Sequence, residues 1–276
     1  MKCGIIGLGL IGGSMGLALK AKEPTMEIVG LDRDEAHCAK ALELGLVERI
    51  VEFAEIERCD IIILAVPVEG VISLTAQLSG VAERTTIIDL GSTKAKIVAS
   101  IPPQIRRNFV AAHPMAGIEK FGPEAAFKEL YENHIVVLCN VEESGEIQRE
   151  RAKWLFERIG MQIVYMDAKE HDRHAAYISH LPHAISYALA NSVLKQEDPK
   201  SILTLAAGGF RDMSRIAKSS PRMWSDIFRQ NRKHLLTSIE AFEQEIAQAK
   251  WMVEEQRWEE LEAWMAHATT LHNILD

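Results

Sequence analysis

A glycine-rich turn directly follows the first apolar run and constrains the fold of this chain more than any other feature. Residues 2–14 read KCGIIGLGLIGGS, so a short strand-like run leads into the spacing Gly-x-Gly-x-x-Gly. Such glycines permit a tight turn, a close approach of the backbone to a pyrophosphate, and close packing of the next helix on the strand. The unpaired N–H groups at the start of that helix would face the phosphates. The pattern predicts a dinucleotide site with contacts from Gly7, Gly9, Leu10, Ile11 and Gly12.

An acidic residue stands at the end of the next predicted strand. Asp32 lies twenty residues after Gly12, where a carboxylate can accept hydrogen bonds from the adenosine ribose hydroxyls. The same carboxylate would repel a 2′-phosphate, so we expect NAD as the cofactor in preference to NADP. Two alternatives stay open: Arg33 could bind that phosphate, and Asp32 could merely cap the helix expected near Glu35.

Short β-branched runs alternate with helical segments over the first 165 or so residues. The run at 61–66 is continuously apolar, as expected of a central parallel strand covered on both faces. Strand–helix alternation predicts βαβ units and a Rossmann-type doubly wound α/β sheet. The predicted strands are Lys2–Ile6, Glu27–Leu31, Asp60–Val66, Thr85–Leu90, Phe109–Ala112, Ile135–Cys139 and Gln162–Tyr165, with helices among others at Ile11–Lys22, Glu35–Leu44 and Ser144–Ile159.

Beyond about residue 168 the strand-like runs stop and helical patterns continue. A helix is predicted at 169–194 with Pro182 able to kink or restart it, a short helix at 201–207 ending at Gly208-Gly209, and a long helix from Pro221 toward Val253. We therefore predict an NAD-binding Rossmann domain at 1–167 and an all-α substrate-binding and dimerisation domain at 168–276. The long helix carries an apolar seam that a partner subunit or the same subunit must cover, formed by Leu235, Ile239, Phe242, Ile246, Ala249 and Val253.

Charge and cysteine content exclude several classes of partner. The formal net charge of −8 argues against nucleic acid or an anionic membrane surface. The four cysteines are scattered without metal-ligand spacing, and no apolar run approaches the length of a membrane span. The N-terminus enters a strand without a signal-peptide pattern, so we expect a cytoplasmic protein.

Several chemistry-bearing residues follow predicted strands, at the sheet edge where ligands of open α/β sheets bind. Val66 and Pro67 end one strand, and Ser92 follows another, where it can contact both nicotinamide and substrate. Thr93 could be only a helix cap. His113 ends a third strand, and a histidine there can take a hydroxyl proton while hydride leaves the same carbon. A lone histidine is often structural, but this position favours a catalytic role.

The helical region carries two histidine pairs and a basic segment. His171 with His174, and His180 with His183, have a spacing compatible with a metal, but no third ligand is placed to complete a site and no metal is expected. Between Arg211 and Lys233, seven bases stand against two acids, which suits a small anionic ligand. The glycine pair at 208–209 would let the backbone approach such a ligand, and either Arg211 or Arg215 could pair with a carboxylate.

Taken together, these motifs resemble the prephenate dehydrogenase family over nearly the whole chain. The first motif is generic to dinucleotide binders, whereas the other four, in this order, are specific to the family. In chain order, the five motifs are Gly7-Leu-Gly-Leu-Ile-Gly-Gly-Ser14, His113-Pro-Met-Ala-Gly117, Ser179-His-Leu-Pro-His183, Gly208-Gly-Phe-Arg-Asp-Met-Ser-Arg215 and Trp224-Ser-Asp-Ile-Phe228.

The resemblance implies NAD-dependent oxidative decarboxylation of prephenate to 4-hydroxyphenylpyruvate in tyrosine biosynthesis, by a homodimer joined through the helical domain. By matching position, His113 would act as the base with Ser92 nearby, and Trp224 would approach the pocket from its own or the partner subunit. The positions implied to bind substrate are Arg215, His183, Ser179, Gly208, Glu119, Asp212 and Trp224.

Three alternatives remain at this point. Arogenate dehydrogenase shares the motifs and acts on a substrate with an amine in place of the side-chain keto group. A 3-hydroxyacid dehydrogenase of the six-phosphogluconate type shares the plan but uses a lysine base, where residues 169–194 carry histidines. A scaffold that binds NAD without chemistry would leave His113, His183 and Arg215 unexplained.

Overall fold

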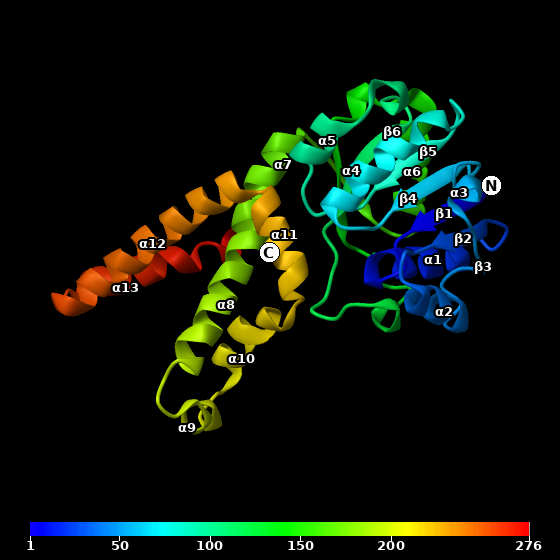
Figure 1. Cartoon of the computed structure of the whole chain (residues 1–276). Helices are drawn as coiled ribbons and strands as arrows, with labels where there is room; N and C mark the ends of the chain where they lie inside the picture. Colours follow the sequence, from blue (N-terminus) through cyan, green and yellow to red (C-terminus); the bar gives the residue numbers. More distant parts are fainter. Residues whose placement is uncertain (276) are drawn as a thin grey trace. The chain divides into compact units, whose positions relative to one another are not determined.

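One eight-stranded sheet organises the N-terminal part of the chain. In the computed structural model, which describes residues 1–275, the strand order is β3-β2-β1-β4-β5-β6-β7-β8 (Figure 1). The strands from β3 to β6 run parallel, β7 pairs antiparallel with β6, and β8 is parallel to β7. This order confirms the predicted doubly wound sheet. The strands are β1 (Lys2–Ile6), β2 (Glu27–Leu31), β3 (Arg49–Ile50), β4 (Ile61–Leu64), β5 (Thr86–Asp89), β6 (Phe109–Pro114), β7 (Ile135–Cys139) and β8 (Gln162–Met166).

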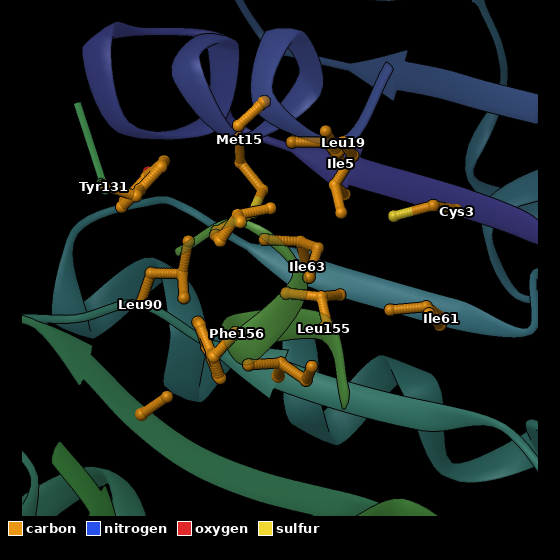
Figure 2. Packing of buried hydrophobic residues seen from close by; sticks show 14 of the residues in the cluster. Cys3, Ile5, Met15, Leu19, Ile61, Ile63, Leu90, Tyr131, Leu155 and Phe156 are labelled. Carbon is orange, nitrogen blue, oxygen red and sulfur yellow. The ribbon is translucent and has the colours of Figure 1, made fainter. Parts of the chain in front are cut away.

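Helices cover both faces of this sheet, which is why the central strands are apolar throughout. In β4, Ile61 and Ile63 point to one face, against α1 (Leu10–Lys22) and α6 (Glu146–Arg158). Figure 2 shows this layer, with Met15 of α1 and Phe156 of α6 packed over the strands. The alternate residues of β4 point to the other face, against α4 (Val68–Gln77) and α5 (Ala95–Ser100). The smaller helices α2 (Glu35–Glu43) and α3 (Phe53–Ile56) complete the two layers.

A nearly continuous helix leaves the sheet after β8. Asp167 caps α7 (Ala168–Ala175) by accepting hydrogen bonds from the amides of Lys169 and Glu170. One π turn (Ala176–His180) then joins α7 to α8 (Leu181–Leu194), and Figure 1 shows the two helices running end to end. Pro182 lacks the N–H group that a regular helix would use, so the register changes just before it. A new helix thus begins at Leu181 with Pro182 in its first turn, which is the predicted restart.

Two helix predictions in the following segment are wrong. Gly208-Gly209 does not end a helix but begins α10 (Gly208–Arg215), which follows α9 (Pro199–Thr204) and packs against α8. The predicted long helix is divided into α11 (Pro221–Gln230) and α12 (Arg232–Glu254). The break occurs at Asn231, whose buried amide nitrogen lies 2.6 Å from the carbonyl oxygen of Asp172.

That break coincides with a division of the chain into two compact units. The first comprises Met1–Asn231, and the second begins at Arg232 and holds α12, α13 (Trp258–Thr269) and α14 (His272–Leu275). The predicted helical domain extends to Asp276, which lies outside the described residues. Short 3-10 turns occur in the first unit at Leu78–Gly80, Pro103–Ile105, Pro123–Ala125, Val141–Glu143 and Ile216–Lys218.

The second unit leaves much of its apolar seam exposed. In α12, Leu235 is 6% exposed, whereas Ile246 and Val253 are 52% and 50% exposed. In α13, Trp258 and Met265 are also about half exposed, at 57% and 49%. Contacts within this chain therefore cover only part of the seam. Among residues 1–275, no helix is long and apolar enough to cross a membrane.

Candidate active site

The glycine turn between β1 and α1 has space only for glycine at two positions. Gly7 has a φ of 95°, and a Cβ there would overlap the carbonyl oxygen of Ala65. A Cβ on Gly12 would overlap the carbonyl oxygen of Gly7. A Cβ on Gly9 would meet no heavy atom within 4 Å, so Gly9 is the glycine of this turn that faces open space. The turn thus has the close packing and the open side that a pyrophosphate cradle needs.

The first turn of α1 is free to bind an anion. No side chain caps it, and it contains no acidic residue. The unpaired N–H groups of Leu10, Ile11 and Gly12 and the positive end of the helix dipole therefore remain available for phosphate oxygens.

Asp32 connects the end of β2 to the glycine turn. Its Oδ2 accepts a hydrogen bond from the amide of Leu8 at 2.7 Å, and its Oδ1 accepts one from the amide of Asp34 at 3.0 Å. The residue that caps α2 is Asp34, which accepts from the amide of Ala36. Asp32 is therefore not the cap, and its carboxylate lies beside the turn where a ribose would reach it. Arg33 is exposed to solvent.

A buried ion pair supports the loop that carries Ser92. Ser92 is half-buried, and Val66 and Pro67 lie on the adjacent loop between β4 and α4. Two residues beyond Ser92, the fully buried Lys94 pairs through Nζ with the fully buried Asp89. The same nitrogen donates to the carbonyl oxygen of Ala112 at 2.7 Å, so it holds the ends of β5 and β6 together.

His113 lies at the end of β6 and belongs to a chain of buried groups. Its Nδ1 is 2.8 Å from Nε2 of His171, and the two rings meet edge to face. His171 in turn places Nδ1 2.9 Å from Oδ1 of Asp172. Burial, together with the nearby His171 and Lys94, lowers the pKa of His113 well below its ordinary value. The imidazole is therefore neutral near pH 7, as a general base must be.

The Asp172 carboxylate, on α7, also caps the start of α5. It accepts hydrogen bonds from the amides of Lys94 at 2.7 Å and Ala95 at 2.9 Å. Burial would raise the pKa of Asp172, but the hydrogen bonds from His171 and these two amides hold it below its ordinary value. The side chain is therefore a carboxylate.

A second histidine cluster surrounds Trp224. The ring of His183 stacks on Trp224 with centroids 3.5 Å apart, and its Nδ1 donates to the carbonyl oxygen of Ser179 at 2.9 Å. His180 approaches the same tryptophan edge on, and burial lowers its pKa to about 4. Among residues 1–275, the buried indole N–H of Trp224 has no hydrogen-bond partner. Trp224 packs against histidines of its own chain.

The two candidate arginines on α10 differ in their contacts. Arg215 pairs with Glu119, which follows β6, at 3.2 Å, and both side chains are partly exposed. Arg211 instead contacts the nearby backbone: its Nε donates to the carbonyl oxygen of Ala206, five residues earlier, at 3.1 Å. Of the two, only Arg215 is joined to the segment that follows His113. Asp212 and Gly208, also on α10, are exposed.

Sequence patterns missed three buried residues of this site. No sequence pattern points to Lys94, and the spacing of His171 and His174 suggests a metal ligand pair rather than a partner for His113. In the structure His171 is buried, whereas His174 is 46% exposed on another side of α7. Within residues 1–275, no three His, Cys, Asp or Glu side chains are grouped to hold a metal ion. No spacing rule could have paired His113 with a histidine 58 residues away.

A glycine turn after β1, an acid at the end of β2 and a neutral histidine at the end of β6 are the arrangement expected of a dinucleotide-dependent dehydrogenase. Sequence comparison agrees with this class and narrows it. The nucleotide-binding domain of prephenate dehydrogenase matches residues 15–165, and the dimerization domain of prephenate dehydrogenase matches residues 167–267. The chain belongs to the prephenate dehydrogenase family.

Individual relatives resemble the chain over most of its length. Prephenate dehydrogenase of Bacillus subtilis is 34% identical over 264 residues, which cover 93% of this chain and 71% of that protein. The crystal structure of prephenate dehydrogenase from Aquifex aeolicus, in complex with hydroxyphenyl propionate and NAD+, matches with a TM-score of 0.92. Its identity is 31%, and the match covers 100% of this chain and 98% of that one. Synechocystis arogenate dehydrogenase matches with a TM-score of 0.82 and 27% identity over 100% of both chains.

Replacing single glycines tests the cofactor turn. Gly12→Ala would force a Cβ against a backbone oxygen, so its free energy of unfolding should fall by about 1–3 kcal/mol in urea denaturation. Gly9→Ala has space for its Cβ and should unfold like the unsubstituted protein, but the methyl group would occupy the phosphate side and weaken NAD about tenfold or more in calorimetry. Gly80→Ala, also unobstructed but remote from the turn, is the matched control and should change neither quantity.

Stability should fall as the pH decreases below the ordinary histidine pKa. Burial holds the pKa of His180 at about 4, whereas in the unfolded chain it would be about 6.5. The unfolded state therefore binds more protons between these values, and His180 alone should lower the free energy of unfolding by about 1.4 kcal/mol per pH unit. His113 shifts in the same direction. Urea denaturation at several pH values measures the slope.

A matched pair of variants assigns that slope. His180→Gln should make it shallower, because glutamine does not titrate, whereas His174→Gln should leave it unchanged because His174 is exposed. Equal stability at about pH 7 and about pH 5 would contradict the expectation.

Proposed function

We propose that this protein catalyses the NAD-dependent oxidative decarboxylation of prephenate to 4-hydroxyphenylpyruvate in tyrosine biosynthesis. The observation that carries the proposal is the position of His113. This neutral, half-buried histidine lies at the carboxyl end of β6, beside the Ser92 loop. The family assignment supports the reaction class. NAD supplies the hydride acceptor when it is bound.

His113 is the group that handles the substrate proton. It takes the proton of the ring hydroxyl as the C–H bond on the same carbon is broken and the oxygen becomes a carbonyl. Loss of carbon dioxide then sends the electron pair of the broken C–C bond into the ring, and the aromatic product needs a proton on that oxygen. His113 returns it, so the residue ends in its starting form. Ser92, on the adjacent loop, donates or accepts one hydrogen bond to hold the hydroxyl in place.

Arg215 is the main ligand for a substrate carboxylate. Prephenate carries two carboxylates, and an arginine fork pairs with a carboxylate through two hydrogen bonds. Arg215 pairs with Glu119 at 3.2 Å, so a substrate anion would compete with a carboxylate already in place. Arg211 donates to the carbonyl oxygen of Ala206 instead. The other positions proposed to line the substrate site are His183, Ser179, Gly208, Glu119, Asp212 and Trp224.

Asp32 favours NAD over NADP. Its carboxylate lies beside the glycine turn and accepts from the amide of Leu8, which supports a ribose-binding role and leaves a 2′-phosphate facing a negative charge. The cofactor contacts proposed here are Gly7, Gly9, Leu10, Ile11, Gly12, Asp32, Val66, Pro67 and Ser92.

The working form is a homodimer of two-domain subunits, with residues 1–167 binding NAD and residues 168–276 binding substrate and the partner. Support comes from the half-exposed apolar side chains of α12 and α13 and from the match to a dimerization domain. A cytoplasmic location is consistent with four free cysteines, three of them buried.

An enzyme assay tests the function. Purified protein with prephenate and NAD should form NADH and 4-hydroxyphenylpyruvate, and His113→Asn should lower kcat by about 10²–10⁴ without weakening NAD. Arogenate, with NAD and with NADP, is the matched comparison, because a solved arogenate dehydrogenase resembles the whole chain. Faster turnover of arogenate than of prephenate would replace the proposed substrate.

Arginine variants test the carboxylate ligand. Arg215→Ala should raise the KM for prephenate about ten- to a hundredfold, because it removes a charge-assisted contact worth about 1.5–3 kcal/mol. The KM for NAD should not change, and Arg215→Lys should recover only part of the loss because an ammonium lacks the planar fork. Arg211→Ala is the matched control four residues away. A rise for Arg211→Ala alone would move the assignment to that residue.

A further inference from the structure

The hydrogen bonds around Asp172 decide which nitrogen of each neighbouring histidine carries a proton. Asp172 is a carboxylate and can only accept. Its Oδ1 already accepts from the amide of Lys94, and its Oδ2 accepts from the amide of Ala95. His171 places Nδ1 2.9 Å from Oδ1, so this nitrogen must be the donor. The Nδ1 of His171 is therefore protonated.

The same reasoning extends to the next histidine. A neutral imidazole with a proton on Nδ1 has a lone pair on Nε2. The Nε2 of His171 is 2.8 Å from Nδ1 of His113, so when both rings are neutral His113 supplies the proton of this hydrogen bond. His113 then carries its proton on Nδ1, and its Nε2 is left with a lone pair.

Burial, with His171 and the Lys94 ammonium nearby, favours a neutral ring at His113 before the reaction. The Lys94 ammonium reaches the carbonyl oxygen of Ala112, next to His113 in the chain, and His180 also lowers the pKa of His113. Asp89 pairs with Lys94 rather than with either ring. The remaining acid, Asp172, is in contact with His171 and not with His113.

We propose that His171 is a positioning residue that, oriented by Asp172, holds His113 in the tautomer whose Nε2 is the base. This proposal rests on the function proposed above and names the atom that performs its proton step. The substrate O–H bond breaks, its proton forms an N–H bond at Nε2, and the oxygen keeps the electron pair to form the carbonyl. The protonated ring of His113 then carries the positive charge. It is stabilised by its Nδ1–H hydrogen bond to His171 and by the Asp172 carboxylate beyond it.

The arrangement follows the logic of a catalytic triad, with histidine in place of the carboxylate as the direct partner of the base. An acceptor on Nδ1 fixes both the tautomer and the ring orientation, and losing it leaves the base in the wrong form for much of the time. Asp172 adds a second task, since it caps α5 and so fixes the Ser92 loop. One carboxylate thereby fixes the positions of both the base and the neighbouring Ser92.

His171→Leu removes the acceptor while keeping an apolar side chain in a buried position. We expect kcat on prephenate to fall about 10²-fold or more, as in enzymes whose base is held in the wrong tautomer. The KM values for prephenate and NAD should change less than about threefold, because His171 is only 3% exposed. His171→Gln should recover part of the rate, since its amide oxygen can accept from Nδ1 of His113.

Nitrogen NMR of protein labelled with isotopic histidine reports the tautomer directly. In the NAD-bound protein without substrate, the His113 signals, assigned by their loss in His113→Asn, should show a protonated Nδ1 and a bare Nε2. In His171→Leu they should move to a mixture or to the opposite tautomer. His174→Gln, on the exposed side of the same helix, is the matched control and should alter neither the rate nor the His113 signals.

Several outcomes would overturn the proposal. It fails if His113 carries its proton on Nε2 in the unsubstituted protein, or if His171→Leu leaves kcat within about threefold. A loss of kcat matched by an equal loss of NAD binding and thermal stability would show a merely structural role. If His171→Leu does not fold, His171→Gln decides by the same readouts. The NMR measurement needs no substrate, so an inactive enzyme on prephenate would overturn the proposed function and leave the tautomer to be judged separately.

Discussion

The geometry of the candidate active site depends on the hydrogen bonds that the Asp172 carboxylate accepts. This carboxylate collects hydrogen bonds from two amides at the start of α5 and from His171, and so connects residues nearly 80 positions apart in the chain. A buried carboxylate is stable only when donors surround it, and here each oxygen has at least one. Because these donors belong to the protein, the loop with Ser92 and the strand with His113 are aligned before any ligand arrives.

A second buried charge pair lies under the same loop and has a different effect. Lys94 and Asp89 are both removed from water, where a single charge would be very unfavourable and a pair is tolerated. The lysine also binds the carbonyl oxygen of Ala112, so the pair closes the ends of β5 and β6 against each other. The ends of these two strands are thus fixed by buried groups, whereas the Arg215–Glu119 pair is partly exposed.

Local features of the sequence predicted most of the fold. The strands at 2–6, 27–31 and 135–139 agree residue for residue with the structure, because apolar runs bounded by turn residues carry the signal. The two-residue strand Arg49–Ile50 has no such periodicity and was missed. The predicted helix from Pro221 was too long because its apolar repeat continues past Asn231. The break there depends on a hydrogen bond to Asp172, 59 residues away, which no local pattern records.

The site divides along the same line. The positions of the glycine turn, Asp32 and His113 were predictable, since each follows or ends a strand. The partners of His113 were not, because His171 and Asp172 meet it only after α7 folds back over the sheet edge. Their histidine spacing pointed to a metal, and only the burial of one histidine and the exposure of the other separates the two readings.

The turn at Gly7 and Gly12 has a consequence for how such a chain can evolve. Side chains that collide can be accommodated by trimming a neighbour, so most crowded positions can drift when a second change occurs elsewhere. At these two glycines the colliding atoms are main-chain oxygens, of Ala65 and of Gly7 itself, which every amino acid possesses. No compensating substitution can remove them. The turn is therefore closed to suppressor mutations, and descendants of this sequence can keep these glycines or lose the turn.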